Sequence, residues 1–222
     1  MHQKTRSIPN TWPIPRKKRT YIVCPKTNQK MEFTLPLIVI MRDILRLVNT
    51  SKEAKKAIDA GDVSVNNKII KETKLGFGLF DLIHIKKLDK MFTILLTKKG
   101  KLYVQEISNT TIKLSKVIGK KTLNKGLTQV NLSSGLNLIT TEKPKVNDSV
   151  LLDLSKKQIV KILPVKKDSD VLVTAGKWKG GLAQIEDVNG SQVIIGVEKN
   201  KINLPVSHIF VLDKEHSGWF KR

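Results

Sequence analysis

The chain has 222 residues, and its 41 Lys and Arg side chains against 19 Asp and Glu give a formal net charge of +22. Such an excess of positive charge is self-repelling in an isolated globule, so it indicates a polyanionic partner, with nucleic acid favoured over an anionic membrane. No apolar run approaches the roughly 20 residues of a membrane span. The single cysteine, Cys24, excludes an intrachain disulfide and favours a reducing, intracellular compartment.

The basic residues are mostly lysine, with only six arginines in the whole chain. Lysine is a flexible point charge suited to phosphate, whereas arginine makes the planar, bidentate contacts that read base edges. The balance favours recognition of a nucleic-acid backbone and its shape over recognition base by base. The length predicts one large domain or a few small ones.

Residues 1–34 are predicted to form an extended basic arm. Four prolines interrupt any helix, and no acidic residue occurs before Glu32. Like charges and few apolar residues predict that the arm is disordered alone and ordered by its partner, with a solubilising tail as the alternative. Trp12 and Tyr21 either anchor the arm to the body or offer stacking faces to bases. The candidate RNA contacts of the arm are Lys4, Arg6, Trp12, Arg16, Lys17, Lys18 and Arg19.

Residues 35–90 are predicted to form a small α+β module. An apolar stripe of helical period runs from Leu37 to Val48, and Arg42 and Arg46, four residues apart, are expected to share a helix face. For these two arginines the alternative to RNA contact is an ion pair with a neighbouring carboxylate.

A second helix and a hairpin complete this module. The helix begins at a capping box of Thr50 and Glu53, and Gly61 is placed to cap its end. Two short strands follow around Asn66 and Asn67, because asparagine tolerates the positive φ of tight turns, and residues 80–87 are predicted as a strand. The candidate RNA contacts of the module are Arg42, Arg46, Lys52, Lys55, Lys56 and Lys68.

Residues 91–165 are predicted to be β-rich. Hairpin patterns occur at 92–107, 128–139 and 148–163. The first and third have lysines at the turn, and the second turns at Ser133-Ser134-Gly135. The lysine-dense stretch "KVIGKKTLNKG" at 116–126 is interpreted as a loop, and its Lys120 and Lys121 are candidate RNA contacts.

Residues 166–213 are predicted to form a small barrel of short strands at 171–174, 182–188, 191–197 and 208–212, followed by a tail at 214–222. The first two strands are joined by "GKWKGG", in which glycines let backbone amides approach a phosphate. Trp178 in this turn is either covered by a base or sugar or folded back over the barrel. The candidate RNA contacts are Gly176, Lys177, Trp178, Lys179 and Gly180.

The order of these segments resembles one family. The segments "LPLIVIMRDILRL" (35–47) and "GDVSVNNKII" (61–70) resemble the alpha-L RNA-binding fold, the S-four-like domain, and "VLVTAGKWKGGLAQIEDV" (171–188) resembles a KOW motif in an SH3-like barrel. With "KLSKVIGKKT" (113–122), "QVNLSSGLN" (129–137) and "VNDSVLLDL" (146–154), the whole chain is similar to the S4e family of small-subunit ribosomal proteins, most closely to its archaeal form.

The resemblance implies an α+β, mostly β fold and a structural role in the small ribosomal subunit. Its expected partners are folded ribosomal RNA and neighbouring ribosomal proteins in the cytoplasm, with no cofactor, metal or small-molecule substrate. A-form RNA has a major groove too narrow for side chains, so recognition of such a partner relies on phosphates, 2′-hydroxyls, shape and splayed bases.

Two other classes of function share features with this sequence. The alpha-L module also precedes the catalytic domain of pseudouridine synthases, but where those have Gly-Arg-Leu-Asp this chain has Gly100-Lys101-Leu102-Tyr103, and its histidines and cysteine are not clustered. Enzymatic activity is therefore not expected. An RNA chaperone or a translation factor with a KOW module shares the charge and the folds, and the sequence does not separate it from a ribosomal constituent.

Overall fold

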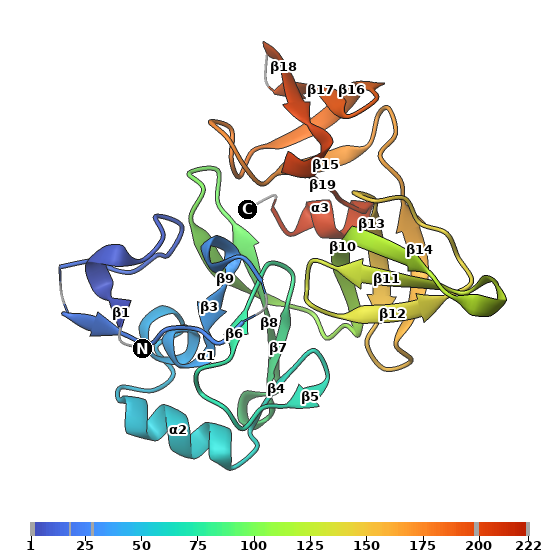
Figure 1. Cartoon of the computed structure of the whole chain (residues 1–222). Helices are drawn as coiled ribbons and strands as arrows, with labels where there is room; N and C mark the ends of the chain where they lie inside the picture. Colours follow the sequence, from blue (N-terminus) through green and yellow to red (C-terminus); the bar gives the residue numbers. More distant parts are fainter. Residues whose placement is uncertain (1–2, 18, 28, 198–199, 221–222) are drawn as a thin grey trace. The chain divides into compact units, whose positions relative to one another are not determined.

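The computed structural model describes residues 3–17, 19–27, 29–197 and 200–220, and the chain divides into two compact units (Figure 1). The first unit comprises Met1–Leu96 with Lys101–Thr111, and the second comprises Thr97–Gly100 with Ile112–Arg222. Strands greatly outnumber helices in the described ranges, which confirms the predicted β-rich α+β class.

The first unit is built on a five-stranded antiparallel sheet in the order β5-β4-β7-β8-β9. Two short two-stranded pairs, β1-β2 and β3-β6, and two helical segments accompany it. The bounds of its strands are β1 Gln3–Lys4, β2 Tyr21–Ile22, β3 Leu35–Pro36, β4 Val63–Val65, β5 Lys68–Ile69, β6 Gly76–Phe77, β7 Leu82–Ile85, β8 Lys90–Leu96 and β9 Leu102–Ile107. Its helical elements are the 3-10 turns Thr5–Ser7, Met31–Phe33 and Lys86–Leu88, α1 Leu37–Val39, the π-helical turn η3 Ile40–Ile44, and α2 Ser51–Asp59.

The first predicted helix is shorter than its apolar stripe. It comprises α1 and η3 and ends at Ile44, and Arg46 beyond it has a left-handed backbone with φ 53°. Residues 37–41 are all buried, so this segment is enclosed on every side rather than along one stripe. The predicted helical register up to Val48 is therefore wrong, although Val48 still packs against Ile38, Val39 and Ala54.

The second predicted helix and the hairpin after it are confirmed. Thr50 Oγ1 accepts from the Glu53 amide at 3.2 Å, and the Glu53 carboxylate accepts from the Thr50 amide at 3.4 Å, which completes the capping box at the start of α2. Gly61 follows the helix with φ 78°, and Asn66 and Asn67 turn the hairpin with φ 50° and 62°. These local signals act within a few residues, so they determine their own geometry.

The arm is closed on itself at Trp12 and joined to the rest of the first unit at Thr11. Only 3% of Trp12 is exposed, and its Nε1 donates to the Met31 carbonyl oxygen at 3.2 Å. The Thr11 carbonyl oxygen accepts from the Leu102 amide at 2.7 Å, which joins the arm to the start of β9. Of the two alternatives for Trp12, the structure therefore shows packing, whereas Tyr21 on β2 is 58% exposed.

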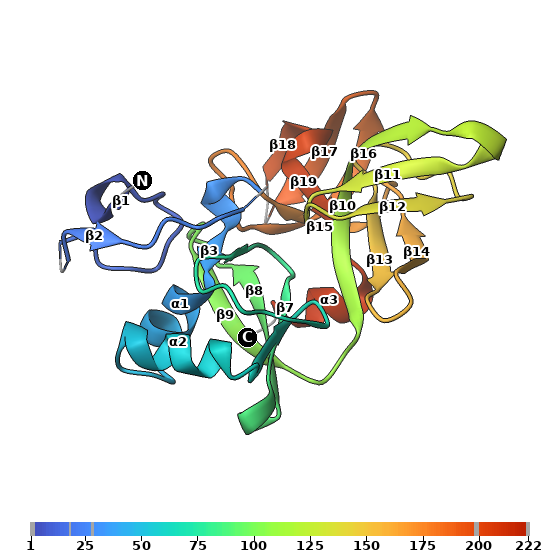
Figure 2. The same cartoon turned by 60° about the horizontal axis from the view of Figure 1, so that its bottom comes forward.

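The second unit contains two five-stranded antiparallel sheets, in the orders β12-β11-β10-β13-β14 and β18-β17-β16-β15-β19. Figure 2 shows β10 as the long central strand of the first of them. The bounds are β10 Ile112–Thr122, β11 Thr128–Leu132, β12 Asn137–Thr140, β13 Ser149–Asp153, β14 Gln158–Leu163, β15 Asp170–Val173, β16 Leu182–Asn189, β17 Gln192–Val197, β18 Asn200–Pro205 and β19 Ile209–Val211. Two 3-10 turns, Asn124–Gly126 and Val206–His208, and the helix α3 Lys214–Gly218 complete the unit.

The lysine-dense stretch at 116–126 is mostly strand, so its interpretation as a loop is wrong. The first half of β10 pairs with β13 and its second half pairs with β11, with a bulge between Val117 and Gly119. Pairing with a neighbouring strand satisfies backbone groups regardless of how many lysines the strand carries. The strand β18 was also missed, while the strands predicted near 171, 182 and 191 are present.

Candidate nucleic-acid interface

Of the candidate cations in the arm, four are exposed and Arg16 is partly buried. Lys4, Arg6, Lys17 and Arg19 are exposed, and Lys18 lies outside the described residues. Arg16 is partly buried, and its Nη2 donates to the Ile8 carbonyl oxygen at 2.9 Å and to Asn10 Oδ1. The predicted RNA contact at Trp12 is wrong, because its ring is buried. Arg16 has contacts within the arm, and its RNA contact stays a prediction.

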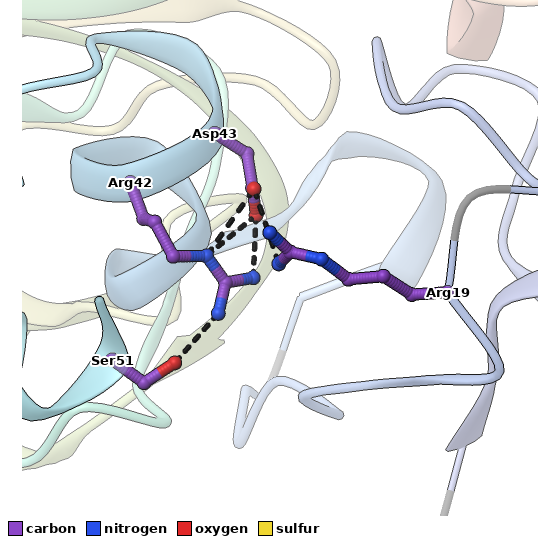
Figure 3. Close-up of polar contacts among 4 residues, drawn as sticks. All are labelled: Arg19, Arg42, Asp43 and Ser51. Carbon is purple, nitrogen blue, oxygen red and sulfur yellow. Dashed lines mark hydrogen bonds and ion pairs between the residues drawn. The ribbon is translucent and has the colours of Figure 1, made fainter. Parts of the chain in front are cut away.

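Two arginines converge on one carboxylate at the junction of the arm and the helices (Figure 3). Arg42 Nη2 donates to Asp43 Oδ2 at 2.7 Å, and Arg42 Nη1 donates to Ser51 Oγ at 2.6 Å. Arg19 Nη1 lies 3.3 Å from Asp43 Oδ1. We call Arg19, Arg42, Asp43 and Ser51 the arginine cluster. It links the arm, η3 and the first residue of α2 through charge-assisted hydrogen bonds.

The arginine cluster changes the prediction for Arg42 and Arg46. The two side chains do not share a helix face, since the helix ends at Ile44 before Arg46. Arg42 has the ion pair that was the alternative to RNA contact, and only 13% of its side chain is exposed. Arg46 is exposed, so it retains the predicted capacity to reach a phosphate.

Two hollows flank the arginine cluster. The first hollow, of about 540 Å³, is lined by Arg19, Tyr21, Ile22, Val23, Cys24, Pro25, Lys26, Arg42, Ser51 and Lys74. The second hollow, of about 390 Å³, shares Arg19, Tyr21, Ile22 and Arg42 with it and adds Asp43 and Arg46 among others. The sequence did not predict either hollow, because the walls combine the arm with residues near Arg42 in both and with Lys74 in the first.

The predicted lysines of α2 and β5 form an exposed basic surface. Lys52, Lys55 and Lys56 are exposed, while Ala54 and Ile58 of the same helix are buried. Spacings of three and four residues place these lysines on one helix face. Lys68 on β5 is exposed as well.

The lysines of β10 divide into two groups. Lys120 and Lys121, at the end of the strand, are exposed as an RNA contact requires. Lys113 and Lys116 are buried, and Lys116 Nζ donates to the carbonyl oxygens of Val206, Ser207 and Ile209 at 3.0, 3.0 and 2.7 Å. An ammonium group has three donors, so this lysine is satisfied inside the second unit. No local pattern in the sequence distinguishes it from the exposed lysines.

In the glycine-rich turn after β15, Lys177 is exposed and Gly180 is buried. Gly176 and Lys177 are exposed, Trp178 and Lys179 are partly buried, and Lys177 Nζ lies 5.9 Å from the Trp178 ring centroid. Gly180 is buried, its amide donates to the Val173 carbonyl oxygen at 2.7 Å, and a Cβ on it would overlap the Thr97 carbonyl oxygen. The prediction that the Gly180 amide faces a phosphate is therefore wrong. The choice between a stacked and a packed Trp178 stays open.

Comparison with known proteins identifies the family. The sequence model of the family described as "Ribosomal family S4e" matches residues 88–159. A small ribosomal subunit protein eS4 from Archaeoglobus fulgidus is 33% identical to this chain over 223 residues, which cover 98% of this chain and 95% of that protein. The chain belongs to ribosomal family S4e. A second relative of the same name, from Methanothermobacter thermautotrophicus, is 31% identical and covers 97% of this chain.

A solved structure of the S4e family supports the fold. The crystal structure of the 30S ribosomal protein S4e from Thermoplasma acidophilum matches with a TM-score of 0.69 at 22% identity, over 81% of this chain and 94% of that one. The resemblance to S4e drawn from the sequence is thus confirmed.

The described part of this S4e chain exposes lysines on the arm, on α2 and at the end of β10. Within the described ranges, no group of three or more His, Cys, Asp and Glu side chains is placed to hold a metal ion. No helix in these ranges has the length and apolar character to cross a membrane. Cys24 is an exposed thiol at the wall of the first hollow.

Proposed function

We propose that this S4e chain is a structural constituent of the small ribosomal subunit, where it binds folded ribosomal RNA through phosphates and shape. The observation that carries the proposal is the likeness over nearly the whole chain to proteins named small ribosomal subunit protein eS4. The charge agrees with it, because 41 basic residues against 19 acidic ones need a polyanion to neutralise them. As a ribosomal constituent, the chain would act in the cytoplasm beside other ribosomal proteins.

The exposed cations are distributed in a way that suits a folded RNA. The first unit offers Lys4, Arg6 and Lys17 on the arm and the lysines of α2, and the second unit offers Lys120, Lys121 and Lys177. Lysines that neutralise phosphates release counterions, and this release supplies most of the sequence-independent affinity. Arginines are few, and Arg16 and Arg42 are used within the protein, so base-edge reading has a minor part.

The finer domain assignment belongs to the same proposal. We propose an arm at 1–34, an alpha-L module at 35–90, a β-rich domain at 91–165, a KOW motif in an SH3-like barrel at 166–213 and a tail at 214–222. Support comes from the helical pair α1 and α2 beside the β5-β4-β7 sheet, and from the glycine-rich turn that joins β15 to β16.

The salt dependence of RNA affinity tests this function. We expect the affinity for a small-subunit rRNA fragment to fall steeply and linearly on a log–log plot against salt concentration. Replacing Lys52, Lys55 and Lys56 together by Gln removes up to three phosphate contacts and lowers the slope by about 2 to 3. The matched triple Arg variant keeps the charges and the slope. A flat profile for the unmodified chain contradicts the proposal.

Co-sedimentation separates a ribosomal constituent from an RNA chaperone or a translation factor. A constituent remains on small subunits in stoichiometric amounts through washes at moderately high salt, because many phosphate contacts act together. Release of the chain at the same salt at which transient factors leave would favour the alternative.

A further inference from the structure

The first hollow is a second kind of candidate site, separate from the exposed lysines of α2 and of the glycine-rich turn. Four cationic side chains line it, Arg19, Lys26, Arg42 and Lys74, and none of the described residues in its lining is a carboxylate. Its volume of about 540 Å³ is within the range of small-ligand sites, and it is far too small for a duplex. The volume of the hollow and the positive charge of its lining therefore fit one small anionic group.

Main-chain pairing sets two of these lysines side by side. The Lys26 amide donates to the Lys74 carbonyl oxygen at 2.8 Å, and Lys26 forms a parallel bridge with Leu75. Lys26 Nζ also lies 2.5 Å from Glu72, but both of these side chains are well exposed, so solvent weakens that ion pair. Two lysines on neighbouring backbone segments at one hollow concentrate positive charge there, and an anion such as phosphate is attracted to it.

Opposite in character to the cationic wall, β2 and the residues after it give the hollow an aromatic and apolar wall. Tyr21 is 58% exposed at the wall, and Ile22, Val23 and Pro25 give the same hollow an apolar side. Pairing of Tyr21 with Lys4 in the β1-β2 ribbon holds its backbone. A site for phosphate alone needs no aromatic ring, whereas an unstacked base is recognised by stacking on one.

The arginine cluster holds the rim of the hollow. Asp43 accepts from Arg42 and pairs with Arg19, so both guanidinium groups are kept in place before any ligand arrives. Arg19 is still 49% exposed, and its planar group has five donors, so it can bind Asp43 and a ligand together.

We propose that the first hollow receives one unstacked nucleotide of the bound RNA. Tyr21 stacks on its base, Lys26 and Lys74 contact its phosphate, and Asp43 is a positioning residue that keeps Arg19 and Arg42 at the rim. The inference rests on the proposed RNA-binding function and specifies one point of contact within it.

A pair of substitutions at Tyr21 tests the stacking contact. In the full-length chain, Tyr21→Leu is expected to weaken affinity for small-subunit rRNA about tenfold, whereas Tyr21→Phe, which keeps the ring, remains close to the unmodified chain. Neither variant changes the salt slope, since stacking releases no counterions. The melting temperatures of both variants should match that of the unmodified chain, which shows that the substitution leaves the fold intact.

A pair of lysine substitutions tests the phosphate contact. Lys74→Gln is expected to lower the salt slope by about 0.7 to 0.9, the amount for one phosphate contact. Lys71→Gln makes the same change of charge at an exposed lysine in the same loop that does not line the hollow, and we expect the slope to be unchanged.

The single cysteine reports occupancy of the hollow. Cys24 lies in its lining, so bound rRNA should slow alkylation of this thiol by iodoacetamide in the unmodified chain, and less so in Tyr21→Leu at saturating RNA. If the unmodified chain binds rRNA with a steep salt profile but the Leu and Phe variants bind equally well, the nucleotide site is overturned and RNA binding stands. A flat salt profile overturns both.

Discussion

At the residue scale, Asp43 determines where two arginines point. Its side chain is 19% exposed and that of Arg42 is 13% exposed, so their ion pair is largely shielded from solvent. We expect Asp43→Asn to lower the free energy of unfolding by about 1.5 to 3 kcal/mol, the range for a hydrogen bond to a charged group. Urea unfolding measures this change. Asp59→Asn, at an exposed position on α2, should stay within about 0.5 kcal/mol, and equal effects of the two variants would count against a structural role for the arginine cluster.

The Lys116 side chain also makes its contacts inside the protein. Its Nζ donates to three carbonyl oxygens around the turn Val206–His208 and the start of β19. Lys116→Met keeps the length of the side chain but leaves these acceptors without their donor, so we expect a loss of at least about 2 kcal/mol in the free energy of unfolding. Lys120→Met on the exposed end of the same strand should cost less than about 0.5 kcal/mol. Chemical denaturation distinguishes the two, and similar losses would refute the contact.

At the scale of the element, the capping box makes the stability of α2 depend on pH. A hydrogen bond from the Asn49 amide, with a second from Thr50, lowers the pKa of Glu53 below its ordinary value of 4.5. The folded state therefore favours the carboxylate. Its contribution is complete above pH 4.5 and is lost as the pH falls through the lower pKa of the folded state.

The pH dependence can be measured with a charge-matched pair. At pH 7, Glu53→Gln should be less stable than the unmodified chain, and the difference should shrink as the pH is lowered below 4.5. Glu142→Gln removes the same charge at an exposed residue outside any helix and serves as the control. A Glu53→Gln difference that stays constant from pH 7 to acid would exclude the capping carboxylate as its source.

The N-cap hydroxyl of the same element makes a separate contribution. Thr50→Ala removes the acceptor of the Glu53 amide at the start of α2, and loss of such a cap costs about 0.5 to 2 kcal/mol. Thr50→Ser keeps the hydroxyl and should retain most of the stability. Thermal unfolding of the two variants gives the comparison, and an Ala variant as stable as the Ser variant would contradict the role of the cap.

At the scale of the whole molecule, salt should act with opposite signs on the free chain and on its RNA complex. The free chain carries a net charge of +22, so added salt screens its self-repulsion and should raise its melting temperature. In the complex, salt weakens RNA binding and so reduces the stabilisation that binding provides. Melting curves at two salt concentrations, with and without rRNA, test this. If added salt shifted the melting temperature of the free chain and that of the RNA complex in the same direction, the net charge would not govern RNA association.

The sequence by itself determined the features that depend on neighbouring residues. The capping box of α2, the Asn66–Asn67 turn and the β8–β9 hairpin that turns at residues 98–101 are present as predicted, because each is set by backbone preferences within a few positions. The order of such segments along the chain was also sufficient to indicate the S4e family and the β-rich fold.

Only the tertiary structure decided which basic and aromatic side chains face outward. Lys116 and Lys120 are the same residue type on one strand, yet the first is enclosed by the turn before β19 and the second is exposed. Trp12 was a candidate for RNA contact, but its ring is buried and its Nε1 donates to the Met31 carbonyl oxygen. Burial and pairing depend on segments that are distant in the sequence, and a local pattern of charge carries no information about which distant carbonyl or carboxylate will lie beside it.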